Sequence, residues 1–215
     1  MKISRILLGR SVRFGAITGP SEGPIYGWHL VRHCQERYGF LQHPQSLSDF
    51  DYERGVTFLH GIFRSLVVGK FQIFNTGMIA EAQAETDFCA DFLEDVISSL
   101  IEQGIIHINA KKGPNQFFFS ELEMMSSVRL DEYFNIFNQL GERISGLVSS
   151  YGQEVPTFTF GSLALSSFGN IPWFRFENKV NAQPGVFYTS APLQTAHHLA
   201  VLEDLEGLLA KIAAS

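Results

Sequence analysis

Residues 86–104 carry the pattern that most constrains the fold of this chain, because they form a helix with a single apolar face. Thr86 can cap this helix, Asp87 suits its positive N-terminal end, and Gly104 is placed to end it. Apolar residues recur every three to four positions along it. They are Phe88, Phe92, Leu93, Val96, Ile97, Leu100 and Ile101. A helix of this kind has to cover a second layer of structure.

A tight hairpin is predicted directly before this helix. Residues 71–74 and 78–80 are strand-like, and they flank Asn75-Thr76-Gly77, which is typical of a tight hairpin turn. The hairpin belongs to a strand-like stretch over 56–84, and other strand-like segments are 3–17, broken near Gly9 and Gly15, then 105–109, 116–119, 121–128, 156–165, 172–180 and 186–189. Helical patterns cover 131–151 and 195–212, and 26–38 is compatible with a short helix. Since adjacent hairpins outnumber strand-helix-strand crossovers, we predict an α+β fold, a mostly antiparallel sheet with about three amphipathic helices packed on it.

The strand-strand-helix pattern recurs once. Thr86-x6-Leu93-Glu94-Asp95-x4-Leu100 matches Thr195-x6-Leu202-Glu203-Asp204-x4-Leu209, with a constant offset of 109 residues. Two ββα halves, residues 65–104 and 171–213, would explain the match. The alternative is that threonine caps and Leu-Glu-Asp triplets are simply common in amphipathic helices.

Composition indicates one large core. Among the 215 residues, 45% are hydrophobic, 18% are charged and twenty are Phe. Average soluble domains carry roughly 25% charged residues, so extended disorder is not expected. Phe offers apolar area without a polar group, and many of these side chains must therefore fill a core or an interface. We predict a single globular domain over residues 1–215.

Charge and cysteine content narrow the function classes. A net charge of −6 argues against general nucleic-acid binding, which requires a basic face. Cys34 and Cys89 lack metal-like spacing, which favours buried free thiols in a reducing compartment. Arg5 and Arg10 interrupt the apolar start of the chain, so it does not resemble a secretory signal, and no membrane span is predicted. These patterns favour a cytoplasmic location.

Candidate chemical groups are few. His29 and His33 stand four apart, as helical metal ligands do, and His197-His198 lies near the start of the last helix. Asp49-x-Asp51-x-Glu53 resembles the start of a calcium loop, but Arg54 replaces the required Gly. Hydrolase, Walker and dinucleotide motifs are absent from the sequence. We therefore predict no cofactor and no metal site, and we leave catalytic residues unassigned.

Separated charges suggest an interface instead. Residues 1–21 hold Lys2 and three arginines without an acid, whereas residues 81–102 hold seven acids without a base. Opposite patches can orient two proteins as they dock, although a solvated helix face gives the same pattern. Trp173 to Phe176 is compatible with either a core or an interface. The candidate interface residues are Arg5, Arg10, Arg13, Trp173, Arg175, Asp91, Glu94 and Asp95.

Two function classes follow from these patterns. The first, which we favour, is a non-catalytic protein-interaction or assembly subunit of an intracellular complex, with a protein partner or self-association. The second is a metal-assisted hydrolase that uses His and Asp/Glu residues.

Overall fold

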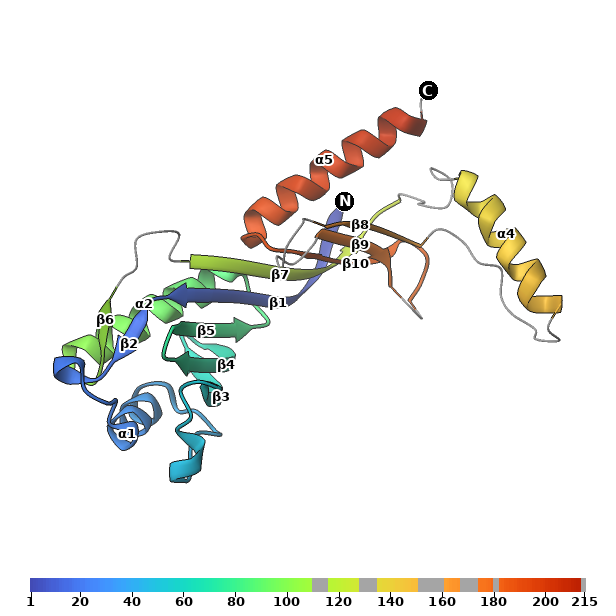
Figure 1. Cartoon of the computed structure of the whole chain (residues 1–215). Helices are drawn as coiled ribbons and strands as arrows, with labels where there is room; N and C mark the ends of the chain where they lie inside the picture. The colour runs from blue at the N-terminus through green and yellow to red at the C-terminus, as the bar shows by residue number, and fades with distance from the viewer. Residues whose placement is uncertain (110–115, 128–134, 151–160, 167–173, 180–181, 214–215) are drawn as a thin grey trace. The chain divides into compact units, whose positions relative to one another are not determined.

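A computed structural model describes residues 1–109, 116–127, 135–150, 161–166, 174–179 and 182–213, and its elements are labelled in Figure 1. The described chain divides into two compact units. The first, here called the N-terminal unit, comprises Ile6–Glu121 and Pro192–Thr195. The second, the C-terminal unit, comprises Met1–Arg5, Leu122–Ala191 and Ala196–Ser215. A single domain over residues 1–215 stays a prediction.

The elements of the described residues fall into two series with the same order. The first series is β1 (Lys2–Phe14), β2 (Ala16–Thr18), α1 (Gly27–Tyr38), β3 (Val56–Phe63), β4 (Leu66–Phe74), β5 (Gly77–Ala82) and α2 (Thr86–Glu102). The second series is β6 (His107–Asn109), β7 (Gln116–Met125), α4 (Asn135–Ser150), β8 (Ser162–Leu165), β9 (Phe174–Asn178), β10 (Val186–Ala191) and α5 (Thr195–Ala213). Two 3-10 turns, η1 (Pro20–Glu22) and η2 (Leu47–Asp49), lie in the loops beside α1.

The predicted α+β fold with a large antiparallel sheet is confirmed. Eight strands are hydrogen-bonded in the order β3-β4-β5-β1-β7-β10-β9-β8, and β2 pairs with β6. Asn75 and Thr76 form the turn between β4 and β5, as predicted. The described residues contain four α-helices, where about three were expected. The additional helix is α1. It has only 12 residues, and its few apolar positions lie among polar and charged ones, so its helical periodicity is weak in the sequence.

The predicted break near Gly9 is wrong. β1 runs without interruption from Lys2 to Phe14, and Gly9 pairs with Ala82 of β5. A Cβ atom at Gly9 would lie 2.2 Å from the carbonyl oxygen of Ala84. Glycine is therefore needed here because the connection between β5 and α2 passes very close to β1, and not because the strand ends.

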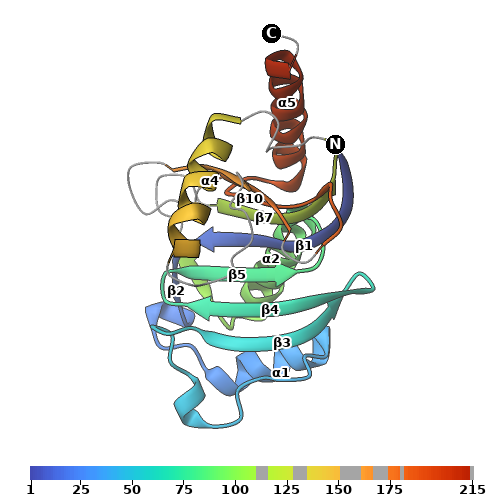
Figure 2. The ribbon, with the colours of Figure 1, turned by 90° about the vertical axis from the view of Figure 1, so that its right-hand side faces the viewer.

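One face of the sheet in the N-terminal unit carries both of that unit's helices. Phe58, Phe71 and Ala80 lie opposite one another on β3, β4 and β5, and all three are fully buried. They share a core cluster with residues of α1 and α2, among them Cys34 and Phe92. In Figure 2, α2 lies behind the strands β1, β5 and β4. The helices thus pack side by side on this face, and Tyr38 of α1 and Phe92 of α2 place their rings 5.1 Å apart.

The second series repeats the element order of the first. Among the described residues, and leaving out β2 and β6, both series read strand, helix, three strands, helix. β5 and β10 are six-residue strands that begin at Gly77 and Val186, and α2 and α5 begin at Thr86 and Thr195, 109 residues apart. The two threonines meet in the N-terminal unit: each backbone N–H donates to the other's Oγ1, at 3.0 and 2.9 Å. Thr86 is the first residue of α2 and not its N-cap, which is Glu85.

Candidate interaction surface

The acidic residues of α2 form ion pairs within their own unit. Glu94 Oε1 lies 3.1 Å from Nη2 of Arg13 on β1, and Asp95 Oδ1 lies 2.8 Å from Nη2 of Arg37 on α1. Asp91 pairs with Arg64 in the turn between β3 and β4. These pairs connect α2 to three other elements and so help to position them.

Asp95 accepts more hydrogen bonds than Asp91 or Glu94 among those shown by the structure. Besides the guanidinium of Arg37, it accepts a hydrogen bond of 2.7 Å from the Tyr38 hydroxyl. The hydrogen bond from Arg37 is the main reason that the pKa of Asp95 lies below its usual range. Burial is the main reason that the pKa of Tyr38 is raised. A role for Asp91, Glu94 and Asp95 in an interface stays a prediction, and any partner would have to compete with these internal arginines.

The remaining predicted interface residues lie elsewhere. Arg10 bonds Glu81 at 2.8 Å and stacks over the Phe119 ring at 5.6 Å. Arg5 is exposed on β1, and Arg175 Nη1 lies 3.8 Å from Glu177 Oε1 on β9. Trp173 lies outside the described residues. The seven described residues of this set therefore lie in several separate places, and the joint role of all eight in binding stays a prediction.

The histidine pair on α1 takes up two unrelated positions. His33 Nε2 lies 3.0 Å from Ser99 Oγ of α2, and burial lowers the pKa of His33. The His29 ring instead packs against the Tyr26 ring, 5.8 Å between centroids. Within the part of the chain that the structure describes, no group of three or more His, Cys, Asp and Glu side chains is arranged to hold a metal ion.

The histidine pair on α5 divides in the same way. His197 is exposed, whereas His198 is fully buried. The hydroxyl of Thr189 donates its hydrogen to the Arg175 carbonyl at 2.8 Å. The same oxygen lies 2.9 Å from His198 Nε2 and can only accept there, so Nε2 carries the hydrogen of the neutral ring. Desolvation lowers the pKa of His198 to about 4, and the ring is therefore neutral at pH 7.

Burial of a neutral His198 predicts an acid-sensitive fold. Because the pKa falls from 6.5 to about 4 on folding, this residue's contribution to stability is complete above pH 6.5 and is lost as the pH falls toward 4. The loss amounts to about 3 kcal/mol at 1.36 kcal/mol per pKa unit. Urea unfolding of wild type and His198→Gln between pH 4 and 7 measures it. The free energy of unfolding should depend less on pH in the variant, and parallel profiles would contradict the prediction.

The acids of the loop between α1 and β3 fold that loop. Asp49 Oδ2 accepts the backbone N–H groups of Gln45 and Ser46, both at 2.8 Å, and completes a capping box with Ser46 at η2. These backbone hydrogen bonds, the one from Gln45 first, lower the pKa of Asp49. Asp51 Oδ1 accepts the N–H groups of Glu53 and Arg54. The Asp49/Asp51/Glu53 pattern therefore reflects turn formation.

Both ends of this loop are tied to the sheet. Gln42 and Leu59 exchange backbone hydrogen bonds of 3.3 and 2.8 Å, and the N–H of Asn75 donates to the Tyr52 carbonyl at 2.9 Å. Gly55, at φ 95°, allows the chain to turn into β3 beneath the Phe74 ring. The loop thus has one well-defined backbone path.

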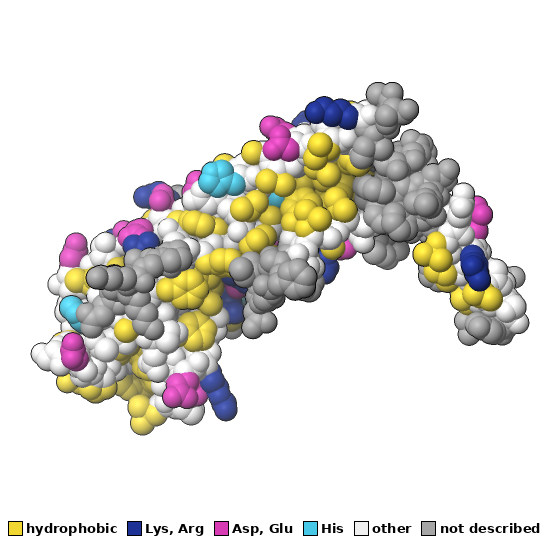
Figure 3. All heavy atoms as spheres, turned by 45° about the horizontal axis from the view of Figure 1, so that its top comes forward, with side chains coloured by type: hydrophobic (Ala, Val, Ile, Leu, Met, Phe, Trp, Pro, Cys, Tyr) yellow, Lys and Arg dark blue, Asp and Glu magenta, His cyan; other side chains and the backbone are white. Residues whose placement is uncertain are grey.

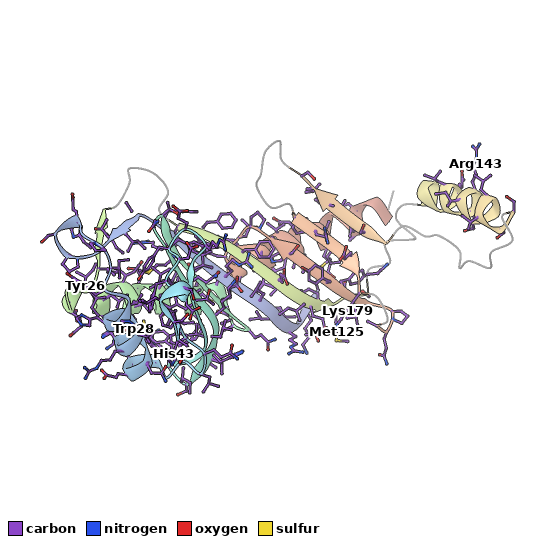
Figure 4. All side chains as sticks on the ribbon, turned by 60° about the horizontal axis from the view of Figure 1, so that its bottom comes forward. Tyr26, Trp28, His43, Met125, Arg143 and Lys179 are labelled. Carbon is purple, nitrogen blue, oxygen red and sulfur yellow. The ribbon has the colours of Figure 1, made fainter. Side chains whose placement is uncertain are left out.

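Large apolar side chains project into solvent from this ordered loop. Leu41 is 78% exposed and Leu47 is 79% exposed. Trp28, at the start of α1, is 50% exposed and meets the Phe50 ring edge-on at 5.1 Å. Together with exposed Tyr26 and half-buried His43 they form what we call the loop surface: Tyr26, Trp28, Leu41, His43 and Leu47. Figure 4 shows Tyr26, Trp28 and His43 on the side of the N-terminal unit that faces the viewer.

His43 of the loop surface also lines a pocket of about 360 Å³. Thr57 and Leu59 of β3 line it together with Gln42, His43 and Asp49 of the loop. His43 Nδ1 lies 3.1 Å from the Pro44 carbonyl oxygen, which helps to orient the ring. The pocket is large enough for a single bulky side chain, with polar groups at its edge that can accept or donate hydrogen bonds.

Sequence reasoning did not identify the loop surface. Leu41, Leu47 and Trp28 are not among the eight residues that the sequence predicts for an interface. A usable signal was present, because Leu41 and Leu47 belong to neither apolar helical periodicity nor strand alternation. An apolar residue with no place in a core pattern is a candidate contact residue.

Comparisons with known proteins add no further assignment. The sequence matches no known family model and no curated protein. None of the described helices combines the length and the hydropathy needed to cross a membrane.

Proposed function

We propose that this chain is a non-catalytic protein-interaction subunit that binds a partner protein through the loop surface. The observation that carries the proposal is that Leu41 and Leu47 are held almost fully exposed on a loop whose backbone is fixed by hydrogen bonds. An ordered loop loses little conformational entropy on binding, and exposed aromatic and aliphatic groups are typical binding anchors.

The surroundings of the loop suggest the chemistry of its partner. Residues 39–55 contain Asp49, Asp51 and Glu53 against the single base Arg54. A matching partner would offer an apolar socket with basic residues around it. Cys34 and Cys89 are free and buried, which supports assembly in a reducing compartment such as the cytoplasm.

Substitution of the anchors tests the proposal. Proteins captured from source cells by the wild-type chain should be lost with Trp28→Ala and with the double variant Leu41→Ser/Leu47→Ser. With the purified partner, Trp28→Ala should raise Kd by about thirtyfold, the effect of a 2 kcal/mol hot spot. Leu66→Ser is the matched control, since Leu66 is also exposed in this unit but lies outside the loop surface. Equal binding by all variants would reject the proposal.

Tryptophan fluorescence gives a second readout. The chain has two Trp residues, so Trp173→Phe leaves Trp28 as the single reporter. Binding at the loop surface should shift the emission of Trp28 to shorter wavelength and protect it from acrylamide, because its exposed edge leaves water. Unchanged emission and quenching at saturating partner would place the contact elsewhere.

A further inference from the structure

The outer edge of β3 is only partly paired. β3 is a terminal strand of the eight-stranded sheet, and it is the lowest strand in Figure 2. One antiparallel bridge, between Gln42 and Leu59, lies along this edge, and the Leu41 N–H donates to the His60 carbonyl at 3.4 Å. Among the described residues, no other backbone group is hydrogen-bonded to the outer edge of β3. The rest of this edge is therefore open to another strand.

The backbone of Thr57 points toward the open part of this edge. Successive residues of a strand direct their N–H and C=O groups to opposite edges, so residues two apart direct them to the same edge. Leu59 exchanges both of its backbone groups with Gln42 across the outer edge, at 2.8 and 3.3 Å. Thr57, two positions before Leu59 in the same strand, therefore presents a donor and an acceptor on the outer side.

The pocket described above lies at this open part of the edge. Thr57 belongs to its lining, together with Gln42 and Leu59, which form the bridge. A strand that paired with Thr57 would continue along β3 from the bridge, and alternate side chains of such a strand lie on the same side. Backbone hydrogen bonds and a pocket for one side chain are the two features that proteins use to bind an extended segment at a sheet edge.

The charges around the pocket indicate which side chains such a segment carries. Asp49 lines the pocket, and Asp51 and Glu53 follow it in the same loop. The single base, Arg54, lies 3.5 Å from Asp51, so the loop keeps an excess of negative charge. In Figure 3, magenta acidic and yellow hydrophobic side chains are interspersed on the visible side of the N-terminal unit, at the left of the view. A segment with Lys or Arg beside an apolar residue would complement these surroundings.

We propose that the partner protein adds an extended, basic segment as a strand to the outer edge of β3 at Thr57, with one apolar side chain of that segment in the pocket. The inference rests on the proposed function and states the form in which the partner binds. It connects to the loop surface through Leu41 and His43, because Leu41 is bonded to β3 at this edge and His43 lines the pocket. Leu41 would then contact the partner beside the added strand.

Random 12-residue peptides displayed on phage are the probe for this site, and they are selected on the immobilised full-length chain. Enriched sequences should carry Lys or Arg next to an apolar residue. The best of them is synthesised with a fluorescent label, and its Kd is measured by anisotropy for wild type, Thr57→Val and Thr57→Pro. Thr57→Pro should raise the Kd about tenfold over Thr57→Val, as expected for the loss of one backbone hydrogen bond.

Thr57→Val is the matched control for the loss of the hydroxyl. Both variants lose the Thr57 Oγ1 atom, which accepts a hydrogen bond of 2.9 Å from Gln72 Nε2, but only Thr57→Pro loses the backbone N–H. Proline is tolerated at edge positions whose N–H faces away from the sheet, so the variant should fold. Circular dichroism checks that it does.

Methylation of the peptide's own backbone nitrogens gives a second measurement on the wild-type chain, which does not depend on the folding of any variant. A strand donates to its neighbour only from alternate residues. N-methyl groups should therefore raise the Kd strongly at every second position of the peptide and weakly at the positions between them. A Kd that does not alternate along the peptide would overturn the strand addition.

The remaining outcomes separate this inference from the proposed function. Peptides that lose binding with Trp28→Ala, but bind Thr57→Pro as well as Thr57→Val, would overturn the added strand and leave the loop surface in place. A selection that enriches no sequence would also reject the inference. If light scattering gave wild type twice the 24.1 kDa chain mass and Thr57→Pro the single mass, a second copy would occupy the edge, and the proposed partner segment would be wrong.

Discussion

Phe92→Ala should lower the free energy of unfolding by about 3–5 kcal/mol, as expected for loss of a fully buried aromatic side chain. The Phe92 ring is completely buried and lies 5.1–5.6 Å from the rings of Tyr38, Phe63 and Phe71. These partners come from α1, β3 and β4, so the cavity would loosen both helices from the sheet. Typical domains have only about 5–15 kcal/mol of stability, and the loss would therefore shift urea unfolding to much lower concentration.

Phe14→Ala is the matched control, because Phe14 is exposed on β1. Its removal should cost less than about 1 kcal/mol, as for most surface substitutions. Denaturation followed by near-ultraviolet circular dichroism reports the aromatic core directly. Similar losses in the two variants would mean that the ring cluster is not the centre of stability in the N-terminal unit.

Local periodicity was sufficient to predict the elements that build this core. The apolar stripe from Phe88 to Ile101 identified α2, and Asn75-Thr76-Gly77 identified the turn between β4 and β5. Both signals arise from residues that are close together in the sequence, so they can be recognised without knowledge of the fold. The false break at Gly9 has the opposite origin. That glycine is required by the distant Ala84 carbonyl, a contact that the local sequence does not contain.

The candidate site was harder to predict for the same reason. Charge counts located the basic and acidic segments, but not that Arg13 would pair with Glu94, 81 positions later, or Arg37 with Asp95. Such pairs depend on which elements the fold brings together. The sequence therefore indicated complementary charges, but it could not distinguish pairing within the chain from pairing with another protein.

The loop surface illustrates a second limit. In sequence, Asp49 and Asp51 resemble the start of a calcium loop, whereas in the structure both carboxylates accept backbone hydrogen bonds of their own loop. Whether Leu41 and Leu47 are buried depends on the path of the backbone that these acids fix. Exposure is a property of the tertiary structure, and only the unexplained position of these leucines in the pattern was visible beforehand.

The second large effect on stability is expected at Thr86 and Thr195, which exchange hydrogen bonds. Replacing both, in Thr86→Val/Thr195→Val, should lower the free energy of unfolding by about 3–5 kcal/mol, because two buried backbone N–H groups lose their acceptors at about 1–3 kcal/mol each. Valine keeps the shape of threonine, so packing changes little. Both hydroxyls are buried, and their oxygen atoms lie 3.3 Å apart. Chemical denaturation of wild type, the two single variants and the double variant gives the four free energies of unfolding for a double-mutant cycle.

The cycle should be less than additive by about 1 kcal/mol, because the hydroxyl–hydroxyl contact is already lost in either single variant. Thr18→Val is the matched control: Thr18 Oγ1 is also buried, but lacks a hydrogen-bond partner among the described residues. Its replacement should be neutral or stabilising, since no bond is broken. If Thr18→Val and Thr86→Val lowered the free energy of unfolding equally, the change from Thr to Val would be the cause, and not the lost hydrogen bonds. Strict additivity would mean that the starts of α2 and α5 are held independently, although each backbone bonds the other's side chain.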